Sequence, residues 1–275
     1  MSVVLCNGRV LDADDCGSAA GSALHALASR NYGHFTSMQV RGGAVRGLDL
    51  HLRRLREATR DLFATELDDQ RVLDGLRRGL DAAATADCSA RVTICAAAFD
   101  FRDPLRAVEV DVIVSISAPA EPEPEPEPRR VKSFHHERAL PHVKHVGTFP
   151  LFHFARAARG AGFDDALFVT HDGRLSEGSV WNLGLWDGRQ VTWPLAPALR
   201  GTSEQLLQAG LDALGVAQAR REVRLEELAG FRAGFACNSR GVWPLAGVDE
   251  MAWPPAPDLA ELLAQALARH PWQPV

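Results

Sequence analysis

The sequence contains very little lysine or tyrosine. Among its 275 residues, lysine occurs only at Lys132 and Lys144, and tyrosine only at Tyr32. The other basic side chains are arginines, which stay charged in proteins and do not serve as amine nucleophiles. Chemistry that requires a primary amine on a side chain therefore has two candidate residues.

Other features are missing too, and each absence excludes a class of protein. The net charge of -5 at pH 7 argues against a nucleic-acid-binding surface. No apolar run approaches the ~20 residues that span a membrane. Residues 1–10 lack the basic region and long apolar run of a signal peptide. We expect neither a nucleic acid nor a membrane as a partner.

The cysteines and histidines form no recognisable framework. The cysteines number five, an odd count without CxxC spacing, which favours a reduced, cytoplasmic setting over disulfides. Several histidines lie between residues 135 and 153, but their spacing matches neither HExxH nor a zinc finger. We expect no metal site.

A run of alternating glutamate and proline gives the clearest boundary. Residues 117–130 read SAPAEPEPEPEPRR, which excludes a helix or interior strand and favours an extended, solvated segment. The chain is 46% hydrophobic, enough for one large core or two smaller ones. We predict an N-terminal α/β domain (1–117), a linker (118–130) and a C-terminal domain (131–275). A docking role for the repeat is the alternative to a plain linker.

Strand and helix patterns occur on both sides of this linker, and in the N-terminal part they alternate. A hairpin is expected to turn at Gly42-Gly43. Helices are predicted at residues 50–63, 69–86, 149–162, 201–215 and 258–270, and strands at 91–99, 107–117, 130–136, 165–170, 178–186, 190–194 and within 234–249.

Glu177 occupies a position where a carboxylate is unexpected. It stands next to Gly178 in HDGRLSEGSVWNLGLW, residues 171–186, ahead of a strand that reads as buried. An unpaired buried charge is very costly, so Glu177 must have a partner. The structural alternative is a strand-end carboxylate that caps a turn.

Lys144 is the stronger of the two amine candidates. It lies between Val143 and Val146, and an apolar setting disfavours the charged form and leaves a usable nucleophile near neutral pH. The alternative is a surface lysine whose stem lies along apolar neighbours. Lys132 follows two arginines and reads as an exposed strand residue.

Two turns carry hydrogen-bond donors suited to a phosphate group. Thr202 and Ser203 stand at a helix start, where free amides and hydroxyls can bind an anion. Thr202 and Gln205 could instead form a capping box. Asn238 and Ser239 form the second turn.

Taken in order, five motifs resemble the class IV aminotransferase family, the fold type IV enzymes that use pyridoxal 5'-phosphate (PLP). The motifs run from about Phe35 to Asp249. The most specific, GFDDALFVTHDGRLSEGSVWNLGLW, resembles the family's G-x-(D/E)-(D/E)-A-L…G-x-(hydrophobic)-x-E-G-(S/T)-x-x-N stretch. The other four are HLRRL, HVKHVGTFPL, LRGTSEQLL and ACNSRGVWPL.

The resemblance implies the α/β (α+β) fold class and a two-domain architecture like that of D-amino-acid aminotransferase, with PLP between the domains. It also implies a homodimer whose partner loop closes the pocket. It implies that Lys144 forms a Schiff base with PLP and moves the substrate proton. It also implies that Glu177 contacts the pyridine nitrogen and keeps it protonated. The implied cofactor-binding residues are Arg54, Lys144, Glu177, Asn182, Thr202, Ser203, Asn238 and Ser239.

The chain departs from the family pattern where the substrate is expected. Phe35 stands where several relatives have tyrosine, Arg102 falls near the place of a substrate-carboxylate arginine, and Trp181 replaces a small residue. The phosphate loop reads Thr-Ser-Glu where Ile-Thr-Arg is common. The predicted substrate residues are Phe35, Arg102 and Trp181.

Three functions are compatible with these features. The first is a PLP-dependent transaminase that moves an amino group between an amino acid or primary amine and a keto acid through Lys144. The second is a lyase of the aminodeoxychorismate type, which releases pyruvate and an arylamine. The third is a catalytically idle PLP-binding protein, against which the intact Lys144 and Glu177 argue.

Overall fold

A computed structural model of the chain describes residues 2–11, 18–120 and 126–275. They form two compact units. Unit 1 holds the described residues before 121 together with Val143–Gly147 and Trp272–Val275, and unit 2 holds the rest. Two short segments from beyond the predicted linker thus belong to unit 1. Cys16 and residues 121–125 of the Glu-Pro repeat lie outside the described residues.

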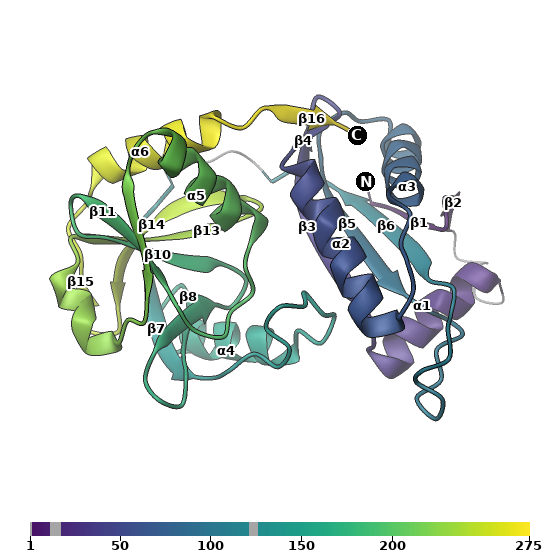
Figure 1. The fold of residues 1–275 in the computed structure, drawn as a ribbon, viewed down its shortest axis with the longest axis horizontal. Coiled ribbons are helices and arrows are strands. Elements are labelled where there is room, and N and C mark those ends of the chain that lie inside the picture. The colour runs from purple at the N-terminus through teal and green to yellow at the C-terminus, as the bar shows by residue number, and fades with distance from the viewer. Residues whose placement is uncertain (1, 12–17, 121–125) are drawn as a thin grey trace. The chain divides into compact units, whose positions relative to one another are not determined.

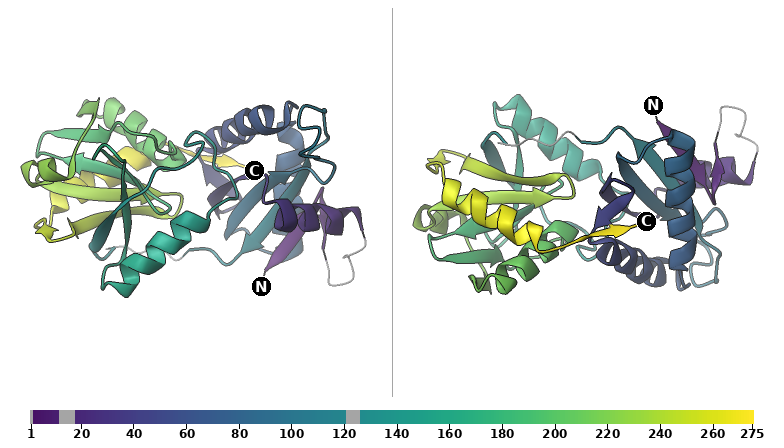
Figure 2. Two further views of the ribbon diagram at one scale, coloured as in Figure 1. Left: turned by 90° about the horizontal axis from the view of Figure 1, so that it is seen from below. Right: turned by 90° about the horizontal axis from the view of Figure 1, so that it is seen from above.

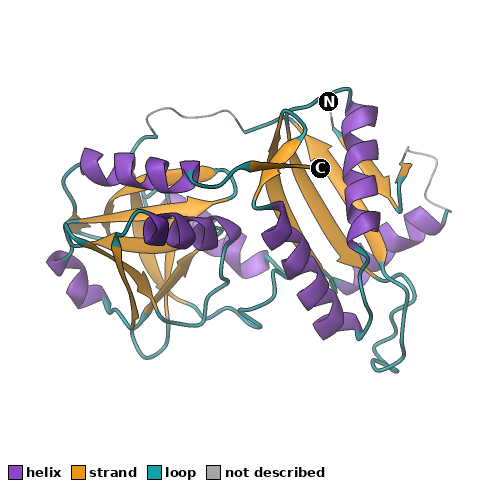
Figure 3. Cartoon of the chain, turned by 45° about the horizontal axis from the view of Figure 1, so that its top comes forward, coloured by secondary structure: helices purple, strands orange, loops and turns teal. Residues whose placement is uncertain are grey.

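Unit 1 is built on a twisted antiparallel sheet (Figure 1; Figure 3). Its strand order is β16-β4-β3-β5-β6-β1-β2. The strands are β1 (Val3–Cys6), β2 (Arg9–Val10), β3 (His34–Arg41), β4 (Ala44–Arg46), β5 (Cys88–Cys95), β6 (Asp111–Ser117) and β16 (Trp272–Pro274). The helices are α1 (Ala19–Arg30), α2 (Leu48–Phe63) and α3 (Asp69–Ala83).

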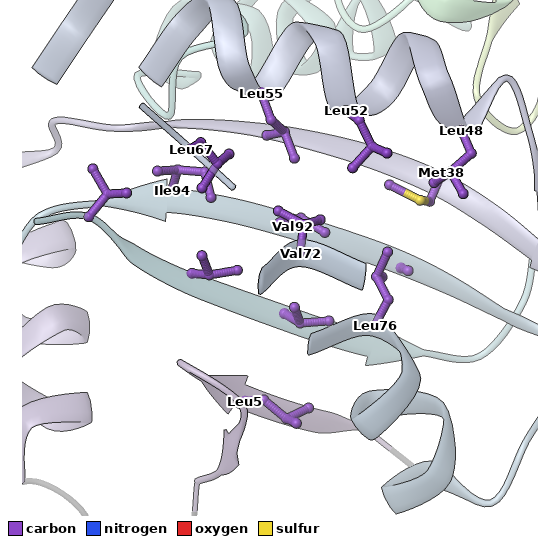
Figure 4. Packing of buried hydrophobic residues seen from close by; sticks show 14 of the residues in the cluster. Leu5, Met38, Leu48, Leu52, Leu55, Leu67, Val72, Leu76, Val92 and Ile94 are labelled. Carbon is purple, nitrogen blue, oxygen red and sulfur yellow. The ribbon is translucent and has the colours of Figure 1, made fainter. Parts of the chain in front are cut away.

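One face of this sheet is covered by α2 and α3. Figure 4 shows Leu52 and Leu55 of α2 and Leu76 of α3 directed toward the strand side chains, among them Val92. These leucines recur at the spacing of a helical face, as the sequence predicted. Burial of each such side chain contributes about 1.5–3 kcal/mol, so this layer fixes how α2 lies on β3.

The other face of the unit 1 sheet is covered in part by α1, where Ala23 packs against Cys6, Cys95 and Ile113. Successive side chains of a strand point to opposite faces. Met38 and Val40 of β3 belong to the layer under α2 and α3. Phe35 is an odd number of residues away from both, so its side chain points to the opposite face, which is the α1 side of the sheet.

Unit 2 contains a closed barrel. The strand order is β12-β11-β10-β13-β14-β7-β8-β9, and β9 also pairs with β10, which closes the ring. Its strands are β7 (Arg129–His135), β8 (Asp165–Val169), β9 (Leu175–Gly178), β10 (Asn182–Trp186), β11 (Gln190–Pro194), β12 (Ala217–Arg221), β13 (Ala233–Asn238), β14 (Gly241–Val248) and β15 (Met251–Ala252).

Among its described residues, unit 2 has three α-helices and a short 3-10 helix. They are α4 (Phe149–Gly160), α5 (Thr202–Ala213), η2 (Leu225–Gly230) and α6 (Pro257–Ala268). Helices α5 and α6 cover Trp193 and Phe235, and Figure 2 shows α6, in yellow, lying along the strands of this unit. Helix α4 packs on Phe168.

The sequence located most of these elements, and the α/β class is confirmed. The predicted helix 50–63 corresponds to α2, and the hairpin turns at Gly42-Gly43 between β3 and β4. The stretch 178–186, predicted as one strand, is divided by a corner between β9 and β10. Within the described ranges, no helix combines the length and apolar character needed to cross a membrane.

Candidate active site

Lys144 lies on a short segment of unit 1 that runs beside β3. The backbone N–H of Phe35 donates to Lys144 O at 2.9 Å, and Val146 N–H donates to Gly33 O at 3.0 Å. Val143 is buried and Lys144 is half-buried. Backbone hydrogen bonds at Lys144 itself and two residues after it therefore hold the base of its side chain beside the sheet.

Two cationic side chains lie against the ring of Phe35. Lys144 Nζ is 5.0 Å from the ring centroid and Arg91 Cζ is 3.5 Å from it, distances at which a cation is attracted to an aromatic face. Arg91 Nε donates to Thr93 Oγ1 at 3.3 Å, and burial lowers the pKa of Arg91. No sequence motif marks Arg91, yet the fold brings it and Lys144 to one ring.

The helix α2 carries Arg54 and, one turn earlier, the buried His51. The side chains of Thr36 and His51 are joined by a hydrogen bond of 2.6 Å between Oγ1 and Nδ1. Burial, then the charges of Arg54 and Lys144, lower the pKa of His51 to about 3. Since burial and these two positive charges all disfavour the charged form of the imidazole, the ring stays neutral at physiological pH.

Glu177 lies on β9 in unit 2 and is only 4% exposed. Its Oε1 is 3.8 Å from Nη1 of Arg138, whose side chain is 5% exposed. The backbone N–H of Leu199 donates to Oε2 at 3.2 Å. Burial lowers the pKa of Arg138, and the charge of Glu177 opposes that shift. Arg138, which the sequence analysis did not select, is thus a cationic partner of Glu177.

Asn182 holds the loop that reaches Glu177. It pairs with Glu177 across β9 and β10, and its Nδ2 donates to Leu199 O at 2.6 Å. A Cβ on Gly201 would lie 2.1 Å from Asn182 Oδ1, so this close approach requires glycine. Asn182 therefore acts on the loop in this structure, and its contact with a cofactor stays a prediction.

Trp181 belongs to the barrel core. Its indole covers Gly178, where a Cβ would lie 1.9 Å from the ring. Its Nε1 donates to Asp165 Oδ2 at 3.0 Å, and the residue is buried. This packing explains why the corner after Glu177 has a glycine. A contact between Trp181 and a substrate stays a prediction.

The N-terminus of α5 has amides available for an anion. Gly201 is its N-cap, and no side chain caps it. The capping box considered for Thr202 and Gln205 does not form, because Gln205 Nε2 donates instead to Gly201 O at 3.3 Å. Uncapped first-turn N–H groups at the positive end of the helix dipole are suited to a phosphate.

The second predicted phosphate turn lies next to the first. Ser203 Oγ donates to Asn238 O at 2.7 Å, and Asn238 Nδ2 donates to Val180 O at 3.2 Å. Ser239 follows in the same turn between β13 and β14. The fold therefore assembles Ser203, Asn238 and Ser239 at one end of the barrel, and their contact with a phosphate stays a prediction.

Arg102 lies on an exposed turn of unit 1. Its side chain is 75% exposed and its Nη1 is 3.8 Å from Asp100 Oδ1. The guanidinium also lies over the ring of Phe101, 4.6 Å from the centroid. Its role in binding a substrate carboxylate stays a prediction.

Each unit by itself offers groups that suit part of a cofactor with an aldehyde, a protonated ring nitrogen and a phosphate. Lys144 offers the amine, Glu177 a fixed carboxylate, and α5 with the Asn238 turn a set of anion-binding donors. The part of the chain that the structure describes contains no group of three or more histidine, cysteine, aspartate or glutamate side chains placed to hold a metal ion. The amine of unit 1, and the carboxylate and anion-binding donors of unit 2, each fit one part of PLP.

Comparison with known proteins agrees with this class of site. The family described as "Amino-transferase class IV" matches residues 33–248, so the chain belongs to the class IV aminotransferase family. It is a PLP-dependent enzyme of fold type IV, as the motifs predicted. No curated protein sequence matches the chain.

Solved structures share the fold at low sequence identity. The branched-chain amino acid aminotransferase of Escherichia coli has a TM-score of 0.83 at 17% identity, covering 97% of this chain and 93% of that one. A hypothetical aminotransferase from Mycobacterium tuberculosis, solved with PLP, has a TM-score of 0.77 at 20% identity, covering 97% and 98%. A putative 4-amino-4-deoxychorismate lyase from Legionella pneumophila has a TM-score of 0.74 at 17% identity, covering 84% and 89%.

Proposed function

We propose that this enzyme moves an amino group between an amino acid or primary amine and a keto acid. The observation that carries the proposal is the buried Glu177, held by Arg138 and by the N–H of Leu199. A carboxylate fixed in this way is suited to a charge-assisted hydrogen bond with a protonated ring nitrogen. When bound, PLP supplies the electron sink that stabilises negative charge at the substrate's α-carbon.

Lys144 is the amine that we propose for the Schiff base with PLP and for moving the α-proton. Its backbone hydrogen bonds to β3 restrict where the amine can reach. The neutral His51 adds no further positive charge beside Lys144. Arg54, the first turn of α5 and the Asn238 turn are the proposed phosphate ligands, and a fixed phosphate orients the ring.

Arg91 is our proposed ligand for a substrate carboxylate. It lies against the same Phe35 ring as Lys144. Its guanidinium offers planar, paired donors that match a carboxylate. Arg102, the candidate from the sequence, is a surface side chain in this chain, so the two arginines can be compared directly by mutation.

The test of transamination is an assay of amino transfer. The purified protein is incubated with PLP, a panel of D- and L-amino acids and (R)- and (S)-amines, and pyruvate or 2-oxoglutarate. We expect one donor class to transfer its amino group to the keto acid. Release of pyruvate and an arylamine from aminodeoxychorismate, without transfer to any keto acid, would instead support the lyase. Absence of both reactions with PLP bound would support an idle PLP-binding protein.

We further infer a homodimer in the cytoplasm. The homodimer follows from the family resemblance, and the compartment is supported by Cys6, Cys88, Cys95 and Cys237, which are free and buried. Sedimentation at assay concentration tests the assembly. A fully active monomer would contradict it.

A further inference from the structure

The segment from residue 195 to residue 201 links the two halves of the unit 2 site. Its Leu199 N–H donates to Glu177 at 3.2 Å, and Gly201 begins α5, where the uncapped amides lie. On its inner side, Ser176 Oγ donates to Pro197 O at 2.6 Å and Asn182 Nδ2 donates to Leu199 O at 2.6 Å. A shift of this segment would therefore move donors at both ends.

The side chain of Arg200 forms hydrogen bonds with the start of this segment and with α5. Its Nη2 lies 3.4 Å from Pro194 O and 3.2 Å from Ala196 O, and it donates to both. Its Nη1 donates to Glu204 Oε1 at 2.7 Å. One planar guanidinium thus bridges the start of the segment to the first turn of the helix that follows it. A lysine ammonium, a point charge without this fork, cannot reproduce all three contacts at once.

Glu204 is an unusual residue for the first turn of a helix that we propose as a phosphate ligand. It is 1% exposed, and Gln208 Nε2 also donates to its Oε1, at 3.0 Å. The family's loop commonly has arginine at this position. This chain therefore has a negatively charged residue where a positively charged one is common. A buried carboxylate without a counter-charge would be costly and would repel a phosphate. The neighbouring guanidinium of Arg200 offsets this negative charge.

We propose that the Arg200–Glu204 ion pair fixes the 195–201 segment and thereby holds the Leu199 amide on Glu177. Arg200 and Glu204 are then positioning residues, since they act through the backbone of the segment rather than by contact with the cofactor. The catalytic consequence rests on the proposed function, but the hold on Leu199 belongs to the protein itself and can be measured with or without PLP.

The experiment compares Arg200→Met, which removes all three contacts, with Arg200→Lys, which keeps the charge. The matched control is Arg232→Met, because Arg232 forms an exposed pair with Asp258 at 2.9 Å in the same unit. Exchange of individual amide hydrogens is measured by NMR on the full chain, PLP-free and PLP-loaded. Steady-state kinetics are measured on the loaded enzyme.

We expect Arg200→Met to speed exchange of the Leu199 amide by about tenfold or more, with Arg200→Lys intermediate and Arg232→Met like wild type. The amide of Leu185, inside β10, should keep its wild-type rate, which separates local release from global unfolding. In the loaded enzyme, kcat should fall while KM for the amino donor changes less, because the Glu177 contact matters most in the transition state.

An unchanged Leu199 exchange rate in a folded Arg200→Met protein would overturn the proposal. If Arg200→Met does not fold, Glu204→Gln decides, because it removes the ion pair and keeps the side-chain volume. A wild-type exchange rate at Leu199 in that variant overturns the proposal equally. Failure of wild-type protein to form a Schiff base with PLP is a different result. It removes the proposed function, and the exchange rates of the PLP-free chain then decide whether the ion pair holds Leu199.

Discussion

Arg138 and Glu177 form a buried ion pair, with Nη1 and Oε1 3.8 Å apart and both side chains almost fully buried. Glu177 also receives the Leu199 N–H. A carboxylate in such a place is stable only because these groups accompany it. Arg138 is therefore a charged partner of the kind that the sequence analysis expected for Glu177. It fixes the carboxylate that we propose to hold the cofactor ring.

Removal of Arg138 should destabilise the protein strongly. Arg138→Met leaves Glu177 buried without this guanidinium, and we expect the free energy of unfolding to fall by about 3–5 kcal/mol. The double variant Arg138→Met, Glu177→Gln should recover much of that loss, because an amide needs no counter-charge. Urea denaturation of PLP-free protein measures both values. A single-variant cost below about 1 kcal/mol would show that the pair contributes little.

Arg91 and Arg102 make opposite predictions about substrate binding. If Arg91 receives the substrate carboxylate, Arg91→Ala should raise KM for the keto acid at least about tenfold, since charged hydrogen bonds contribute about 1.5–3 kcal/mol. Arg102→Ala should then change KM less than about twofold. The reverse pattern would return the role to Arg102, as the sequence suggested. Thermal unfolding of both variants checks that the fold is intact.

Two buried histidines should make the protein less stable in mild acid. Burial lowers the pKa of His34 to about 4, and burial with the charges of Arg54 and Lys144 lowers that of His51 to about 3. The unfolded chain, with histidine pKa values of about 6.5, binds more protons below that pH. The free energy of unfolding should therefore fall as pH drops from about 6.5 toward these values, by up to about 1.4 kcal/mol per pH unit for each histidine.

His51→Gln provides the control for this pH effect. Between about pH 6.5 and about pH 5, its free energy of unfolding should change less steeply with pH than that of wild type. The difference should be the contribution of one histidine, up to about 1.4 kcal/mol per pH unit. Equal slopes for His51→Gln and wild type would mean that His51 is not held neutral in the folded state.

The sequence predicted the residues that lie within motifs, but not those that the fold brings to them. Glu177 was recognisable because it stands in a dense pattern with Gly178 and Asn182. Arg138 lies far from Glu177 in the chain, among histidines and another glutamate, and nothing local marks it as a buried partner. Arg91 joins Phe35 only through the pairing of β3 with β5, and that register is a tertiary property.

Hydrophobic periodicity also could not predict the short elements of the fold. The C-terminal strand β16 has three residues, one of them proline, and pairs with β4 far away in sequence. The segment Val143–Gly147 follows the predicted linker yet belongs to unit 1, because its backbone bonds to β3. In both cases the partner strand determines the structure, and single-segment patterns carry no information about it.

The measurement that tests the central claim most directly is an absorption spectrum of the protein with PLP, for wild type, Lys144→Ala and Lys132→Ala. These are the chain's only two lysines, so each variant controls for the other. We predict a visible Schiff-base band in wild type and Lys132→Ala that is absent in Lys144→Ala and is bleached by the amino donor. A band that persists in Lys144→Ala, or its absence from wild type, would contradict the assignment of Lys144 and with it the proposed function.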